Sequence, residues 1–438
     1  METCEYVFHN KEKCVENVLK NSEFCILHID LPEDEESEEF KKINESKKKK
    51  VEEKVSKEDF NFEGVKLLEI DFSGMKIKND IDFNHSVIRK NALFIKATIG
   101  GDARFIKATI GGDARFIKAT IGGDARFGGA TIDGYARFGG ATIGKSARFE
   151  GATIGKSARF EGATIGKSAR FGRVRIGRNA WFKGAMICLD AWFKGAIIGG
   201  DAWFEGAKIG GNVRFEGATI GLNAGFKGAK ICKDASFDRT KIGEKIEFKG
   251  TTFKNPEAQK NACRTAKNIW AKSGDREEED YYHYHEMEAK RKQKYKEFSL
   301  KPFLKLIRKL RLEKLISNHI EFFEEKRSIY YGFLDLPIQY IFGYGIYPFR
   351  VIAAWGLTVL LFALYFWIFN GVGRVGNGVE NAESFLENLY FSIFTATTLG
   401  YGDYRPNPGH QLMAGILAIF GTFMWAAFIT IFARKYMR

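Results

Sequence analysis

Phenylalanine and isoleucine recur at a fixed spacing through the middle of the chain. A phenylalanine stands at every eleventh position from Phe72 to Phe248, and an isoleucine follows five positions behind each of them from Ile77 to Ile242. Alanine lies two positions before most of these large residues, and turn-like pairs such as Gly-Gly or Gly-Lys separate the units. Alternation within short segments that glycine interrupts is typical of short strands joined by tight turns. The pattern therefore predicts a β-solenoid over residues 60–254.

A helix with the same repeat is the rival prediction, since a period of eleven also corresponds to three helical turns. Glycine in nearly every unit argues against it, because an internal glycine destabilises a helix by up to ~1 kcal/mol relative to alanine. The spacing resembles the pentapeptide-repeat family, which implies a right-handed four-sided β-helix with phenylalanine or leucine stacked inside and alanine beside it. Strict pentapeptides have a period of ten, so the period of eleven leaves the coil size open, and we favour two units, or twenty-two positions, per coil. Rungs ~4.8 Å apart would make a rod of about 40 Å.

Two uncharged, strongly hydrophobic stretches stand near the end of the chain, at residues 351–369 and 412–433. Each is long enough to cross ~30 Å of hydrocarbon as a helix. Between them, an amphipathic segment at 384–398 leads into the sequence Thr-Thr-Leu-Gly-Tyr-Gly-Asp (TTLGYGD) at 397–403. The pattern predicts two membrane-spanning helices that flank a short pore helix and a pore loop.

The loop has the residues that a potassium filter needs. A potassium ion that enters a membrane loses its water, and rings of backbone carbonyls can replace it. Glycine at alternate positions permits the backbone angles that turn these carbonyls to one side, while Leu399 and Tyr401 can pack behind them. Thr398 can add its hydroxyl oxygen. Ser384 fits an N-cap, and the C-terminal end of the helix that follows would point partial negative charge towards the ion.

Residues 349–434 resemble the two-transmembrane-helix potassium channel family, on the strength of the two spans, the pore helix and TTLGYGD. The resemblance implies that Thr397 and Asp403 support a filter whose potassium-coordinating residues are Thr398, Leu399, Gly400, Tyr401 and Gly402. Leu399 stands where valine is commoner. Tyr401 favours potassium selectivity, since family members with aspartate there tend to lose it. The implied function is passive potassium conduction.

Two further features of this region have alternative interpretations. Gly421 in the second span matches the place of a hinge glycine, and its alternative is close helix packing. A second Gly-Tyr-Gly at 343–345 lacks the preceding threonine pair and the pore helix. We expect it to form an interfacial turn.

Charge predicts the orientation in the membrane. The net charge is +14, and no secretory signal opens the chain. The loop between the spans is acidic on balance, whereas basic residues flank the spans on the other side: Lys309, Arg311, Lys314, Arg350, Arg434, Lys435 and Arg438. We therefore expect a multi-pass protein of the cell membrane with both termini in the cytoplasm.

One pore loop per chain cannot surround an ion, so four identical subunits in the lipid bilayer are expected. No arginine-rich additional span indicates a voltage sensor, so regulation is assigned to the cytoplasmic region and an unknown ligand or regulator. The alternative function is a membrane-anchored scaffold or interaction protein that uses the solenoid and has a silent or non-selective pore. No catalytic group of residues is visible, which predicts that the chain is not an enzyme.

Three cysteines and a histidine form a candidate metal site near the N-terminus. Cys4, Cys14, Cys25 and His28 follow the pattern Cys-x9-Cys-x10-Cys-x2-His, and His9 is a reserve ligand. Three thiolates and an imidazole suit tetrahedral structural zinc, which stabilises segments too short to fold alone. The pattern resembles small zinc-binding modules at the N-termini of some microbial repeat proteins. Unliganded reduced cysteines are the alternative.

The predicted fold is therefore multidomain. The expected order is a zinc module (1–30), a charged linker or loose solvated helix (31–59), the solenoid (60–254), a cytoplasmic helical connector (255–327), an aromatic interfacial segment (328–350) and an all-α pore domain (351–438).

Arginine follows the solenoid repeat at one position of each unit from Arg104 to Arg170, and tryptophan continues it at Trp181, Trp192 and Trp203. The basic exterior argues against imitation of DNA. The same series could contact nucleic acid or lipid head groups, but simple solvation is the expectation, and nucleic acid is not among the expected partners.

Overall fold

The computed structural model describes residues 3–19, 22–297, 337–375 and 380–436. The chain forms two compact units, residues 1–290 and 291–438, which are described separately. Residues 298–336, which contain most of the basic stretch of the predicted connector and the first part of the predicted interfacial segment, lie outside the described residues.

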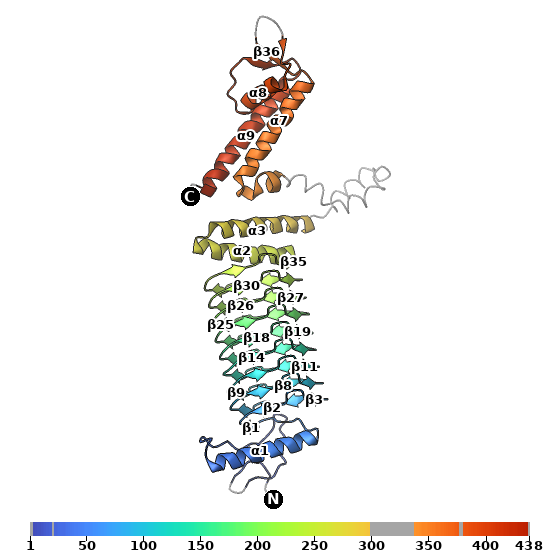
Figure 1. Cartoon of the computed structure of the whole chain (residues 1–438), viewed down its shortest axis with the longest axis vertical. Coiled ribbons are helices and arrows are strands. Elements are labelled where there is room, and N and C mark those ends of the chain that lie inside the picture. Colours follow the sequence, from blue (N-terminus) through green and yellow to red (C-terminus); the bar gives the residue numbers. More distant parts are fainter. Residues whose placement is uncertain (1–2, 20–21, 298–336, 376–379, 437–438) are drawn as a thin grey trace, which may run out of the picture. The chain divides into compact units, whose positions relative to one another are not determined.

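The first unit is built on a β-solenoid with four parallel sheets (Figure 1). Every strand has two residues, and strands four apart in the numbering pair with one another. The nine-, nine-, nine- and eight-stranded sheets run from β1 (Lys66–Leu67) to β33 (Lys241–Ile242), β2 (Ile70–Asp71) to β34 (Ile246–Glu247), β3 (Lys76–Ile77) to β35 (Thr252–Phe253), and β4 (Ile81–Asp82) to β32 (Ala235–Ser236).

The strand register confirms a coil of two repeat units. Ala114 pairs with Ala136, and Thr120 pairs with Thr142, so the two units of one coil occupy opposite sides of the solenoid. The coil resolves the question that the period of eleven left open. Nine rungs at ~4.8 Å span about 38 Å between the first and the last.

Phenylalanine fills the interior in two columns. Rings two repeat units apart stack in parallel, as Phe138 does on Phe160 at 4.8 Å between centroids. Rings one unit apart meet edge to face, as Phe149 does with Phe160 at 5.6 Å and 90°. Both arrangements are favoured by the aromatic quadrupole. These side chains are fully buried, and the stacked isoleucines complete the core.

The arginine series is divided between two faces. Arg104, Arg126, Arg148 and Arg170 lie on the sheet of β4, whereas Arg115, Arg137 and Arg159 lie on the sheet of β2, across the solenoid. In the first coils aspartates neutralise part of this charge. Arg126 pairs with Asp102 at 2.7 Å and Arg148 with Asp124 at 3.2 Å. Part of the arginine series therefore forms ion pairs between neighbouring coils on the solenoid surface.

The charged segment 31–59 contains a helix, α1 (Glu38–Ser56), as one of the two expected alternatives had it, but this helix is packed against other segments and is not loosely solvated. Ser37 caps the helix by accepting from Phe40 N. Lys47 is fully buried, and its Nζ donates to the backbone oxygens of Ile26 at 2.7 Å and Ile29 at 2.8 Å. The charged composition predicted that this helix would be solvated. The prediction failed for Lys47 because the carbonyl groups that replace water around its ammonium belong to another segment of the chain.

Both ends of the solenoid are covered. At the N-terminal end, Lys66 N in β1 donates to Leu27 O at 2.8 Å, and the buried cysteines share one hydrophobic core with the solenoid. At the other end α2 (Pro256–Ser273) and α3 (Arg276–Glu297) lie across the last coil (Figure 1). Trp270 Nε1 donates to Ile246 O, and the Tyr282 hydroxyl accepts from Phe248 N, both at 2.9 Å. These contacts satisfy strand-edge groups that would otherwise invite pairing with other chains.

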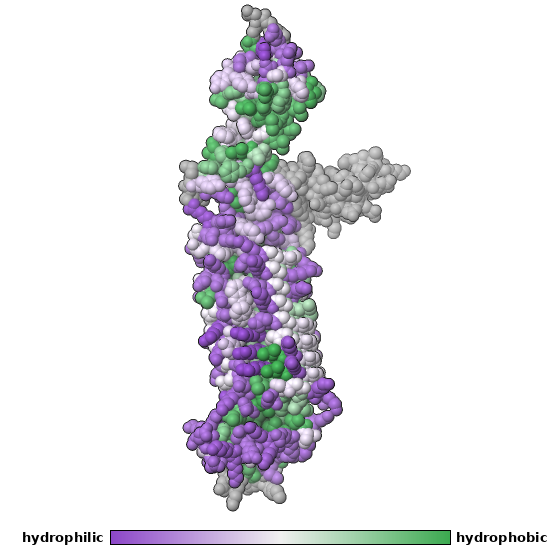
Figure 2. All heavy atoms as spheres, in the orientation of Figure 1, coloured by the Kyte–Doolittle hydropathy of each residue, from purple (hydrophilic) through white to green (hydrophobic). Residues whose placement is uncertain are grey.

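The second unit contains the predicted helices with small changes at their ends. Its elements are η1 (Pro337–Ile341), η2 (Gly343–Gly345), α7 (Pro348–Ile368), β36 (Val372–Arg374), β37 (Glu380–Asn381), α8 (Phe385–Ala396), β38 (Tyr404–Pro406) and α9 (Gln411–Tyr436). Among the described residues, α7 and α9 are the two helices long and apolar enough to cross a membrane. Figure 2 shows hydrophobic residues over much of their visible surface.

The second unit also contains a short 3-10 turn and a small sheet. The second Gly-Tyr-Gly forms the single short 3-10 turn η2, as expected for a turn. A three-stranded antiparallel sheet, in the order β37-β36-β38, was not predicted. Its strands have only two or three residues each, too few for a periodic signal.

Phe138→Ala should destabilise the centre of the solenoid. Phe138 stacks on Phe116 and Phe160 and meets two further rings edge to face, and a cavity of this kind costs ~3–5 kcal/mol. We expect faster hydrogen exchange in the adjacent coils of the full chain. Thr142→Ala, at an exposed position one strand further along, is the matched control. Equal exchange in the two variants would contradict the stacked core.

Candidate functional site

The pore helix α8 begins with a complete capping box. Ser384 Oγ accepts from Glu387 N, and the Glu387 carboxylate accepts from Ser384 N. This confirms Ser384 as the N-cap and fixes where the helix starts. The helix buries Phe391 and Ala396 among α7 and α9, so its C-terminal end is held at a defined place. The loop with TTLGYGD follows directly.

Every second residue of the loop has a left-handed backbone. The φ angles of Thr398, Gly400 and Gly402 are 58°, 44° and 81°. Such alternation turns successive carbonyl groups to the same side of the chain, which is the geometry that a row of coordinating oxygens requires. Glycine tolerates this region, whereas β-branched Thr398 is strained in it. Single non-glycine residues with positive φ also occur in the turns of the solenoid, so it is the alternation along the loop that distinguishes this segment.

The side chains of the loop are largely uncovered within one chain. Leu399 is 64% exposed and Tyr401 is 69% exposed. The Tyr401 ring meets Phe394 of α8 edge to face at 4.7 Å, so it lies against the pore helix as expected, whereas Leu399 has no such cover. The Thr398 hydroxyl donates to Thr397 O at 2.7 Å, which leaves its oxygen lone pairs available. A single chain therefore supplies one side of a site and does not enclose it.

Gly421 lies where α9 crosses the end of α8. A Cβ at this position would be 2.1 Å from the backbone oxygen of Ala396. Such a contact is impossible without a shift of the residue that precedes the Thr397-Thr398 pair. The geometry supports the close-packing interpretation of Gly421, and the hinge role stays a prediction.

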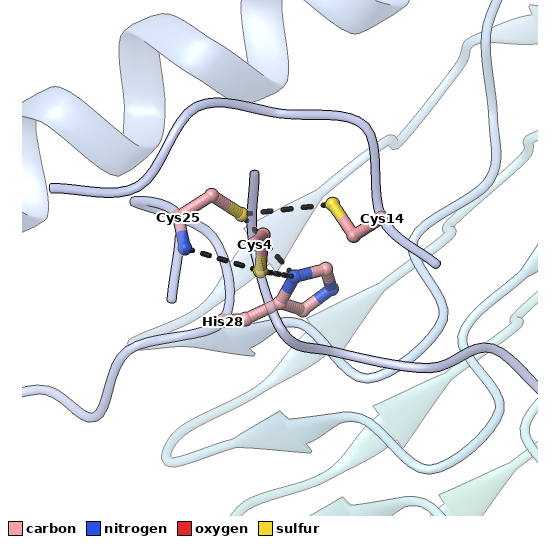
Figure 3. A group of neighbouring side chains, drawn as sticks. All are labelled: Cys4, Cys14, Cys25 and His28. Carbon is pink, nitrogen blue, oxygen red and sulfur yellow. Dashed lines mark hydrogen bonds between the residues drawn. The ribbon is translucent and has the colours of Figure 1, made fainter. Parts of the chain in front are cut away.

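The second candidate site brings Cys4, Cys14, Cys25 and His28 together, and all four are buried. Figure 3 shows their side chains pointing towards one another from separate segments of the N-terminal region. Their ligand atoms lie within 4.8 Å of one another. His28 Nδ1 is 3.2 Å from Cys25 Sγ and 3.4 Å from Cys4 Sγ. The four predicted residues thus form one cluster, and His9 is not part of it.

The partners of His28 orient its ring. Its Nε2 lies 3.1 Å from Glu63 O, so Nε2 carries the proton and Nδ1 offers a lone pair to the cluster. Tyr6 stacks on the ring at 4.1 Å between centroids. Gly64 leaves room for Tyr6, since a Cβ there would lie 2.0 Å from the tyrosine ring. Glu63 and Gly64, at the start of the solenoid, therefore fix the positions of His28 and Tyr6 in the cluster.

Burial sets the protonation of the cluster. It raises the pKa of Cys14 to about 12, raises the pKa of Cys25, and lowers the pKa of His28. The neutral imidazole is the form that binds metals, whereas the thiols need a nearby cation to ionise. Burial also lowers the pKa of Lys47 to about 7, and negative charge on Cys25 opposes that change. Lys47 belongs to a charged run, so nothing in the sequence marked it as a neighbour of the cluster.

Two protein families match the chain. Residues 94–142 and 138–186 match the family described as pentapeptide repeats (9 copies), and residues 353–438 match the family described as ion channel. No curated protein and no solved structure matches.

The chain therefore combines pentapeptide repeats, folded as a β-solenoid of about nine turns, with an ion-channel domain of the two-transmembrane-helix, potassium-channel type. The channel domain supports a function as an ion channel and implies that this part of the chain is embedded in a membrane. The resemblances to pentapeptide repeats and to the two-transmembrane-helix channel domain are confirmed.

Gly421→Ala should destabilise the channel domain, because the new Cβ meets backbone that cannot rotate away. Overpacking of this kind costs ~1–3 kcal/mol. Thermal unfolding of the purified protein should show the loss, while Gly415→Ala, on the same helix with nothing within 4 Å, should keep or slightly raise stability, because alanine favours the helix. If Gly421→Ala keeps its thermal stability and alters only gating, the glycine acts as a hinge.

Proposed function

We propose that the chain is one subunit of a homotetrameric, potassium-selective channel. The observation that carries the proposal is the left-handed backbone at alternate residues Thr398, Gly400 and Gly402. In this proposal the backbone oxygens of Thr398 to Tyr401 and the Thr398 hydroxyl face the ion, with Gly402 completing the loop. Thr397 and Asp403 support its two ends. Potassium moves passively, and the protein has no catalytic activity.

The uncovered side of the loop supports the fourfold assembly. Leu399 and Tyr401 are exposed in one chain although both are large and apolar in character. Neighbouring subunits would cover them and complete the ring of oxygens. Closed rings of identical subunits are the usual way in which a single loop encloses a central site.

We further propose that the spans lie in the cell membrane with both termini in the cytoplasm. Arg434 and Lys435 at the end of α9, and Arg350 near the start of α7, support this orientation. The solenoid and the N-terminal cluster would then be cytoplasmic. Regulation through this region by an unknown ligand belongs to the same proposal.

We assign structural zinc to Cys4, Cys14, Cys25 and His28. Three thiolates and a neutral imidazole around Zn²⁺ carry one net negative charge, and such a closed set of four ligands suits a structural site. The buried ammonium of Lys47 would balance that charge from the neighbouring loop, whose carbonyls it already binds. A positive charge buried beside neutral thiols has no comparable compensation.

Potassium flux into liposomes tests the channel. The wild type should pass potassium in preference to sodium. Gly400→Ala should abolish this flux, since alanine at φ 44° costs ~1 kcal/mol in each of four subunits. Tyr401→Ala should reduce selectivity, and Tyr344→Ala, in the second Gly-Tyr-Gly, is its control. Wild-type protein that is monomeric, or that passes no potassium, would contradict the proposal and favour a membrane-anchored scaffold.

Metal analysis tests the zinc site. Purified protein should contain about one zinc per chain, and Cys14→Ser should lose it. Cys188→Ser, which removes an exposed thiol outside the cluster, should retain it. Chelation should also speed hydrogen exchange in α1, because Lys47 binds the loop between Cys25 and His28. Equal zinc content in both variants would show that the cysteines are unliganded.

A further inference from the structure

The segment that follows the filter is attached to the rest of its own subunit by a small sheet. β38 pairs with β36, so that Tyr404 lies opposite Arg374. One residue beyond β36, Val375 N donates to Asp403 O at 2.9 Å. The outer end of the TTLGYGD loop is therefore fixed to a strand that precedes the pore helix in sequence. This arrangement lies entirely within the described residues.

One carboxylate connects the sheet to the pore helix. Glu387 accepts from the Tyr404 hydroxyl at 3.3 Å and forms an ion pair with Arg374. It also accepts from Ser384 N in the capping box, at 3.3 Å. The side chain of Glu387 is 17% exposed, and that of Arg374 is 51% exposed. Three elements, β36, α8 and β38, thus meet at this single side chain.

Glu387 contacts the residues that fix the outer end of the loop, and it is not itself a residue of the loop. Tyr404 directly follows Asp403, and its ring also meets Tyr390 of α8 at 5.7 Å between centroids. Earlier in the loop, Leu399 is 64% exposed within the subunit. The outer end of the loop is consequently held within its own subunit by polar side-chain contacts, whereas Tyr401 is held by its ring contact with Phe394.

We infer that Glu387 is a positioning residue for the filter, and that its pairing with Arg374 and Tyr404 keeps the outer end of the loop in the ion-coordinating conformation. This rests on the proposed potassium conduction. Without the ion pair, Asp403 and Tyr404 are still held by the β36–β38 backbone bonds and by the contacts of the Tyr404 ring and hydroxyl, but the charged link between β36 and α8 is gone. The carbonyls that coordinate ions at that end would then be more free to turn away, especially when few ions occupy the site.

A glutamine at position 387 separates this role from helix capping. Glutamine serves in a capping box as glutamate does, and it can still accept from Tyr404, but it cannot form the ion pair. Arg374→Gln removes the same pair from the other side without touching α8. Glu383→Gln is the matched control, since Glu383 lies just before α8, its side chain is exposed, and it makes no ion pair among the described residues.

The test is the decay of potassium current through the full-length channel in bilayers after external potassium is lowered. We expect E387Q and R374Q each to speed the decay about two- to fivefold, the effect of losing one exposed ion pair. The double variant should add nothing further, and high potassium should restore the wild-type rate in all of them. E383Q should decay as the wild type does.

Two results would overturn the inference. One is decay in E387Q and R374Q at the wild-type rate. The other is faster decay that potassium does not slow, together with a loss of tetramer on size-exclusion chromatography, since that marks a general structural defect. If E387Q does not assemble, R374Q decides alone. Wild-type protein that passes no potassium would overturn the proposed function itself, and this inference with it.

Discussion

Backbone groups that need a hydrogen-bond partner are the constraint on which both units depend. In the solenoid each coil pairs with the next, and the two open ends are covered by other segments: Leu27 O accepts from Lys66 N at one end, and the Tyr282 hydroxyl accepts from Phe248 N at the other. The channel domain differs, because some of its backbone carbonyl groups have an ion as their proposed partner and not a protein donor. In the proposed filter, carbonyls are kept from protein donors so that an ion can use them.

This contrast also concerns backbone conformation. Left-handed residues occur in the solenoid too, in tight turns such as those at Lys96 and Lys107. In the solenoid, strands of two residues suffice because the ladder and the stacked phenylalanines hold them from both sides. In the loop, Thr398 adopts a left-handed backbone at an energetic cost, and surrounding contacts must hold it there. The pore helix, the close approach at Gly421 and the small sheet around Tyr404 all act on the ends of the same short segment.

The N-terminal region shows how charge can be part of a core. The four metal-ligand candidates, the Tyr6 ring and the Lys47 ammonium are packed against the first solenoid coil. Thiolates bound to a divalent cation and a buried lysine are acceptable together, whereas each alone would be costly. The N-terminal region thus covers the open strand edge of the solenoid, and a bound metal would stabilise the folded form of this region.

The solenoid, the two spans, the pore loop and the four metal-ligand candidates could be predicted from the sequence, because each has a local signature: a fixed period, an uncharged run, glycine at alternate positions, or closely spaced cysteine and histidine. The sequence could not show that the arginine register divides between two opposite faces, since that depends on the coil closing after two repeat units. Only the tertiary structure placed Lys47 beside the cysteines, Gly421 against Ala396, and Glu387 between Arg374 and Tyr404. These contacts join residues far apart in the chain, and polar side chains carry no periodic signal that would reveal which backbone or charge they will meet.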